Sequence, residues 1–207
     1  MTQPVVIWDL GNVLVQWRPE DALQGLYPDA ASLRAAMAEA DFFGWNARLD
    51  AGADWDEAEA RGAADHPRHA ALFAAYRANI ALAHRHAIAG SVALLRALDD
   101  AGLRQLALSN APEAAIAAVR ARHDFMAVFA DVAVSATERV CKPEAEIFRR
   151  LLDRNGLSAR EAIFIDDSAP NVAGAAAFGL TAIHFTGPES LADALNAAGL
   201  PVGRGQP

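Results

Sequence analysis

Val5-Val6-Ile7-Trp8-Asp9-Leu10-Gly11-Asn12-Val13 is the stretch that decides the fold. Its run of apolar residues is typical of a strand buried on both faces of a parallel sheet. The run ends on a carboxylate, Asp9, and the chain then turns at Gly11. Such an acidic residue either points from a central strand into a crevice or marks a strand that ends in solvent. The later part of the chain must decide between the two.

The sequence from Pro19 to about His86 reads as helical throughout, with no strand pattern inside it. Proline and aspartate mark helix starts, and they predict a helix that opens at Pro19 and further helices at 29–40, 54–65 and 67–84. A segment at 42–52, with aromatics and two glycines, is predicted to be a loop-like break. We interpret residues 17–87 as a helical cap domain inserted into a core domain of residues 1–16 and 88–207.

From Ile88 onward, helices and strands alternate. Helices are predicted at 90–100, 112–122, 143–155 and 171–178, and strands at 103–109, 132–135, 162–166 and 181–185. Gly102, Gly156 and Gly179 stand where helices end, and Pro112 and Pro143 stand where they begin. Strands joined by single helices indicate a doubly wound α/β fold with a parallel sheet. The tail at 203–207 is expected to be mobile.

Ligands of doubly wound folds bind beyond the carboxyl ends of the strands. In this chain those ends carry one polar set: Asp9, Gly11, Ser109, Asn110, Lys142, Asp166 and Asp167. Carboxylates from different strands form a hard-oxygen site suited to Mg²⁺. A hydroxyl, backbone donors and an ammonium group suit the oxygens of a transferring phosphoryl group. An aspartate can attack phosphorus and hold it as an acyl phosphate.

The basic residues give a second indication of a site. Of the 18 basic side chains, 17 are arginine and one, Lys142, is lysine. A single lysine in an arginine-rich chain indicates a position that needs a compact ammonium rather than a guanidinium fork.

With these motifs in this order, the sequence resembles the haloacid dehalogenase-like hydrolase superfamily, in the branch with a small helical cap after the first motif. The DLGNV form of that motif resembles sugar-phosphate phosphatases. The resemblance implies that Asp9 is the nucleophile and, with the Gly11 carbonyl, a metal ligand. It also implies that Ser109 and Asn110 hold the phosphate and that Lys142 neutralises the nucleophile and the phosphate. Asp167 is implied to bind Mg²⁺ with Asp166 beside it, and Asn171 is placed near the site.

The chain departs from the family's pattern at Gly11. Most phosphatases of this superfamily carry an aspartate there, which protonates the leaving alcohol and then activates water. General acid–base help of this kind is worth about 10² to 10⁴ in rate. The preferred hypothesis is a Mg²⁺-dependent phosphatase with a different proton donor. The alternatives are a metal-independent 2-haloacid dehalogenase and a catalytically impaired phosphate-binding or regulatory homologue.

Within the cap, Arg48 and Trp45 are predicted to contact the substrate, Arg48 as a guanidinium over an anion. The aromatic residues can equally well plug the seam between cap and core. His84 and His86 are interpreted as a solvated hinge, although either is a possible replacement acid.

Composition limits the partners. The net charge of −8 and the pI near 5.2 argue against nucleic acid and anionic membranes, which both attract basic surfaces. A single cysteine, no signal-like start and no long apolar run favour a cytoplasmic protein. The expected partner is a small phosphorylated metabolite, and the expected assembly is a monomer or a homodimer.

Overall fold

The computed structural model describes residues 3–200 and 202. At its centre is a five-stranded sheet in the order β3-β2-β1-β4-β5 with every pair parallel. The strands are β1 (Val5–Trp8), β2 (Gln105–Ser109), β3 (Asp131–Val134), β4 (Ala162–Asp166) and β5 (Thr181–His184). Because β1 lies between β2 and β4, its carboxyl end is at the point where the strand order reverses. This is the usual ligand position in doubly wound sheets.

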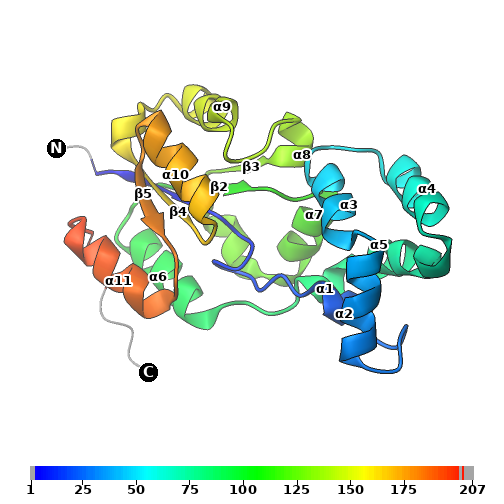
Figure 1. The fold of residues 1–207 in the computed structure, drawn as a ribbon. Helices are drawn as coiled ribbons and strands as arrows, with labels where there is room; N and C mark the ends of the chain where they lie inside the picture. Colours follow the sequence, from blue (N-terminus) through cyan, green and yellow to red (C-terminus); the bar gives the residue numbers. More distant parts are fainter. Residues whose placement is uncertain (1–2, 201, 203–207) are drawn as a thin grey trace.

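Helices cover both faces of the sheet, so the predicted doubly wound α/β fold is confirmed. Val6 and Trp8 of β1 face one core, which they share with α6 (Ala89–Asp100), α7 (Glu113–Arg122) and α11 (Pro188–Ala197). Val5 and Ile7 face the other core with α9 (Ala145–Asn155) and α10 (Ala169–Phe178). Figure 1 shows α9 and α10 above the sheet and α6 and α11 below it. Shorter elements are η2 (Asp124–Val128), α8 (Ser135–Glu138) and η3 (Ala159–Glu161).

A group of helices, which we call the cap, is inserted in the chain between β1 and α6. In Figure 1 it lies to one side of the sheet. It consists of α1 (Pro19–Ala22), α2 (Ala30–Glu39), α3 (Phe42–Asp50), α4 (Trp55–Asp65), η1 (Pro67–His69) and α5 (Ala70–Ala83). The chain enters and leaves the cap side by side: the Gln16 amide donates to the His86 carbonyl, and the Ile88 amide to the Leu14 carbonyl, both at 2.8 Å. The boundaries proposed from the sequence fall within this paired stretch.

The structure corrects several predicted elements. Segment 42–52 is largely helix α3, because Phe42, Trp45 and Leu49 follow helical spacing and are buried together. Ser135 was assigned to a strand but begins α8, and α11 was not predicted. The predicted mobile tail at 203–207 lies outside the described residues. In the described part of the chain, no helix is long and apolar enough to cross a membrane.

Phe148 of α9 tests the core between the sheet and the helices α9 and α10. The side chain is 1% exposed and packs edge-on against Phe164, with ring centroids 5.4 Å apart. We expect Phe148→Ala to lower the free energy of unfolding by about 3–5 kcal/mol, because it removes buried apolar surface and leaves a cavity. Leu82→Ala, at a site 40% exposed, is the control; it should change the value by about 0.5 kcal/mol or less. Denaturant unfolding measures both, and equal effects would contradict the assigned packing.

Candidate active site

A cavity of about 140 Å³ opens at the carboxyl ends of β1, β2 and β4. From the core it is lined by Asp9, Gly11, Asn12, Ser109, Asn110, Lys142, Asp167 and Asn171, together with apolar residues of α7. From the cap it is lined by Asn46, Asp50, Tyr76 and His84. The cavity therefore lies between the two groups of elements and collects polar side chains from both.

Asp9 follows the last residue of β1 and is 7% exposed. Its amide donates to the Ile165 carbonyl at 2.8 Å, which continues the β1–β4 pairing by one residue. Its Oδ1 accepts from its neighbour's amide, Leu10 N, at 2.7 Å and from Lys142 Nζ at 2.8 Å. Burial raises the pKa of Asp9 and Asp166 raises it further, whereas Lys142 lowers it.

Lys142 has a buried ammonium group with three partners. Nζ lies 2.8 Å from Asp9 Oδ1, 2.7 Å from Asp166 Oδ2 and 2.9 Å from the Leu108 carbonyl. Burial alone lowers the pKa of Lys142, but the two carboxylates outweigh it and raise the pKa above the usual value. The group is thus a permanent cation that joins the ends of β1, β2 and β4.

Asp166 and Asp167 have different surroundings. Asp166 is fully buried, and Lys142, Asn171 and the Ser168 amide donate to its two oxygens. Asp167 is partly exposed at the cavity, and burial followed by the charge of Asp166 raises its pKa. Asp167 thus has the freer carboxylate, whereas Asp166 orients its neighbours.

One carboxylate oxygen from each of Asp9, Asp166 and Asp167 lies within 4.8 Å of the others. Mg²⁺ is bound in proteins by one or two carboxylates, with water and substrate phosphate as further ligands. The donor set therefore fits Mg²⁺. Asp9, Asp167 and the Gly11 carbonyl at the cavity wall would hold it, and Asp166 would support the site from behind.

Ser109 and Asn110 end β2 and both line the cavity. The side chain of Asn110 is already engaged, since its Nδ2 donates to the Lys142 carbonyl and its Oδ1 accepts from the Lys142 amide, both at 2.9 Å. This reciprocal pair fixes the backbone on either side of the lysine. The Asn110 side chain therefore positions Lys142, and Ser109 supplies the hydroxyl at this wall.

The structure does not bring Trp45 and Arg48 to the cavity. Trp45 is 2% exposed, donates from Nε1 to the Ala58 carbonyl at 2.8 Å, and packs against Phe73 inside the cap, with the ring centroids 4.9 Å apart. Trp45 therefore packs in the apolar centre of the cap and not on the cavity wall, where its predicted contact with substrate would be. Arg48 lies on the exposed face of α3 and is absent from the cavity wall, so its contact with substrate stays a prediction.

Asp50 was not singled out from the sequence, yet it lines the cavity as the last residue of α3. The sequence offered no direct signal, because 42–52 was predicted to be a loop; only with α3 in view does Asp50 stand out, as a negative charge that the helix dipole disfavours at a C-terminus. His84 also lines the cavity instead of only marking a hinge, and its Nδ1 donates to the Ile80 carbonyl at 3.0 Å.

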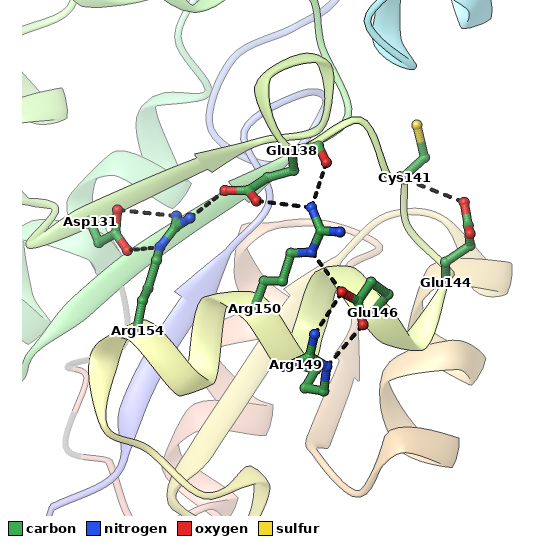
Figure 2. A network of polar contacts seen from close by, with 8 residues as sticks. All are labelled: Asp131, Glu138, Cys141, Glu144, Glu146, Arg149, Arg150 and Arg154. Atoms are coloured by element: carbon green, nitrogen blue, oxygen red, sulfur yellow. Dashed lines mark hydrogen bonds and ion pairs between the residues drawn. The ribbon is translucent and has the colours of Figure 1, made fainter.

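The loop that carries Lys142 is supported from outside by an ion-pair network on α9, shown in Figure 2. Arg154 pairs with Asp131 at 2.6 Å at the start of β3 and also with Glu138 of α8. Arg150 donates to the Glu138 carbonyl at 2.7 Å. Exposed ion pairs individually contribute little to the free energy of unfolding. Together, these pairs connect α9, which follows Lys142 in the chain, to β3 and α8, which precede it.

A sequence model of the haloacid dehalogenase-like hydrolases matches residues 4–179. The chain belongs to this family. Among curated proteins, this hydrolase is similar to the sesquiterpene phosphatase astK of Aspergillus oryzae, with 33% identity over 93 residues, 45% of this chain and 47% of that protein. It is also 40% identical over 79 residues to mouse acyl-CoA dehydrogenase family member 10, covering 37% of this chain and 7% of that protein. The matches thus span about half of the first relative and a small part of the second.

Solved structures show the same fold. YfnB of Bacillus subtilis, a HAD-hydrolase by its description and bound to magnesium, has a TM-score of 0.73 at 18% identity. The match covers 95% of this chain and 100% of that chain. An enzyme of the family from Bacteroides thetaiotaomicron, in complex with magnesium and inorganic phosphate, has a TM-score of 0.70 at 18% identity, with 90% and 96% covered. The L-2-haloacid dehalogenase of Xanthobacter autotrophicus, with chloropropionic acid covalently bound, has a TM-score of 0.65 at 20% identity, with 97% and 85% covered.

Removing the buried cation should destabilise the whole core. We expect Lys142→Met to lower the free energy of unfolding by about 3–5 kcal/mol, because two buried carboxylates lose their compensating charge. Adding Asp166→Asn to this variant should recover part of the loss, since one of those charges is removed. Denaturant unfolding of the wild type, both single variants and the double variant measures the coupling. A Lys142→Met protein as stable as the wild type would contradict the proposed energetics.

Proposed function

We propose that this protein is a Mg²⁺-dependent hydrolase that removes phosphate from a small phosphate monoester through an aspartyl-phosphate intermediate on Asp9. The observation that carries the proposal is the position of Asp9 at the cavity, where Lys142 Nζ and the Leu10 amide both contact its Oδ1. Oδ2 is then the oxygen to attack phosphorus. The ordered carboxylate supplies the nucleophile in a fixed orientation.

The other core residues act on the phosphoryl group. The Lys142 ammonium reduces the repulsion between the Asp9 carboxylate and the anionic substrate and compensates the charge that develops on transfer. The Ser109 hydroxyl donates to a phosphoryl oxygen. Mg²⁺, when bound by Asp9, Asp167 and the Gly11 carbonyl, would supply further positive charge at the phosphoryl oxygens. The rigid strand ends hold these groups in place before the substrate arrives.

A cavity of about 140 Å³ between core and cap supports the proposal of a small substrate. Polar side chains on its wall, among them Asn46, Asp50 and Ser109, would suit a sugar phosphate. Trp17, Tyr76 and Ile116 form an apolar side. Because the similar protein from Aspergillus oryzae is a sesquiterpene phosphatase, a sesquiterpenyl phosphate belongs in the substrate panel beside the hexose 1-phosphates.

Haloacid dehalogenation is the second candidate, and Gly11 favours it, because attack on carbon with loss of halide needs no proton donor. The cluster of three carboxylates argues against dehalogenation. Carboxylates of Asp9, Asp166 and Asp167 within 4.8 Å of one another, with a single lysine between them, repel an anionic haloacid unless a cation is bound. Chloride release from 2-chloropropionate that persists in EDTA would favour the dehalogenase.

A screen for phosphate release tests the proposed function. With Mg²⁺ present, the wild type should release phosphate from at least one monoester of the panel, and EDTA should abolish the signal until Mg²⁺ is restored in excess. Asp9→Asn should lower kcat by a factor on the order of 10⁴ to 10⁶, because the amide cannot attack phosphorus. The acid-quenched wild type should carry acid-stable, hydroxylamine-labile phosphate on Asp9.

Two outcomes contradict this proposal. Turnover that survives Asp9→Asn would mean that another group is the nucleophile. Tight phosphate binding without release from any monoester would favour the non-catalytic phosphate-binding homologue.

A further inference from the structure

Gly11 leaves open space where the superfamily's usual acid would stand. Apart from its two chain neighbours, no described residue has an atom within 4 Å of a Cβ built on Gly11, and the residue lines the cavity. Nothing steric therefore excludes a side chain at this position. The core wall lacks a proton donor there, and any acid has to come from another side of the cavity.

Asp50 lies on that other side and is held firmly. Its carbonyl accepts from Ser135 Oγ at 2.5 Å and from Cys141 Sγ at 3.6 Å, so the end of α3 is fixed to the core beside the lysine loop. Its carboxyl Oδ2 accepts from Asn46 Nδ2 at 3.1 Å, one helical turn earlier. Held by these contacts, Asp50 is the carboxylic acid that lines the cavity from the cap side, opposite Asp9 of the core.

The surroundings of Asp50 favour a protonated carboxyl group. The ionisable groups that face it are Asp9 and Lys142 from the core, Cys141 from the loop and Tyr76 from α5. Burial raises the pKa of Asp50 to about 7 and the charge of Asp9 raises it as well, whereas Asn46 and Lys142 oppose the shift. A carboxyl group of this kind can both give and take a proton near neutral pH.

His84 is the competing residue on the cap side, but its chemistry is unsuited to donation. Burial is the main cause of a lowered pKa, and Nδ1 donates to the Ile80 carbonyl at 3.0 Å. The imidazole is therefore neutral at pH 7 with its proton on Nδ1. Its Nε2 is an acceptor and has no proton to give to a leaving alcohol.

We propose that Asp50, delivered by the cap helix α3, is the general acid and base that replaces the aspartate missing at position 11. The inference rests on the proposed function and adds one residue to it. In the first step Asp9 Oδ2 bonds to phosphorus, the ester P–O bond breaks with its electron pair on the alcohol oxygen, and the Asp50 proton neutralises that oxygen. In the second step Asp50 takes a proton from water, the water oxygen bonds to phosphorus, and the acyl-phosphate P–O bond breaks to restore Asp9. One water is consumed, and Asp50 ends protonated again.

Substrates that differ in leaving group test the role of Asp50. An alkyl phosphate releases a strongly basic alkoxide that needs the proton, whereas p-nitrophenyl phosphate releases a stable phenolate that does not. For Asp50→Asn, kcat/KM should fall by about 10² to 10⁴ on the alkyl phosphate and by less than about tenfold on p-nitrophenyl phosphate. The wild type should lose kcat/KM on the alkyl phosphate as the pH rises above about 7, where Asp50 loses its proton, and Asp50→Asn should not show this limb.

Matched variants complete the design. Asp65→Asn makes the same chemical change at an exposed carboxylate of α4 and should leave both rates unchanged. Gly11→Asp added to Asp50→Asn should restore at least tenfold on the alkyl phosphate, since the position has room for the side chain. Thermal unfolding should give Asp50→Asn the midpoint of the wild type or a higher one, because a neutral amide replaces a partly buried acid.

Several results would overturn the role of Asp50. An unchanged rate on the alkyl phosphate, or an equal loss on both substrates with the pH limb retained, would reduce Asp50 to a structural residue while the phosphatase itself stands. A wild type that turns over no monoester would remove both proposals together.

Discussion

The ammonium group of Lys142 is the constraint on which the rest of the site depends. A buried cation is tolerated only when its partners compensate the loss of water. Here the partners are Asp9 after β1, the Leu108 carbonyl in β2 and Asp166 at the end of β4, all within 2.9 Å. The three strands must therefore keep their register, because a slip of one residue would turn a carboxylate away from the lysine and leave both groups uncompensated.

The same constraint explains the neighbours of the lysine. The side chain of Asn110 forms two hydrogen bonds with the Lys142 backbone, and Asn171 donates to both oxygens of Asp166 at 3.1 Å. An arginine would not replace the lysine, because a planar fork cannot direct its donors to three acceptors around one point. A chain that otherwise uses arginine for every basic side chain keeps its one lysine here. Stability and the proposed phosphoryl chemistry thus depend on the same charges.

The sequence predicted the fold well because parallel strands buried on both faces consist of apolar runs, such as residues 5–8 and 162–165, each followed by an aspartate. Strand ends of one sheet meet at one edge, so Asp9, Ser109 and Asp167 could be grouped without coordinates. The cap was harder. Gly44 and the aromatics of α3 suggested a loop, although Phe42, Trp45 and Leu49 have helical spacing. Which face of α3 meets the core depends on tertiary packing, and this is why Trp45 was assigned to substrate and Asp50 was overlooked.

The arrangement of Gly11 and Asp50 divides the proposed chemistry between two parts of the molecule. In a site with both carboxyl groups on the β1 loop, nucleophile and acid are held together whatever the cap does. In this chain the acid reaches the cavity only while α3 is docked, through the Asp50 carbonyl, on Ser135 and Cys141. Gly52 allows that approach, because a Cβ there would lie 2.6 Å from the Ala136 carbonyl oxygen. In the proposed mechanism, protonation of the leaving group and hydrolysis of the acyl phosphate thereby depend on a docked cap, which would also shield the substrate from bulk water.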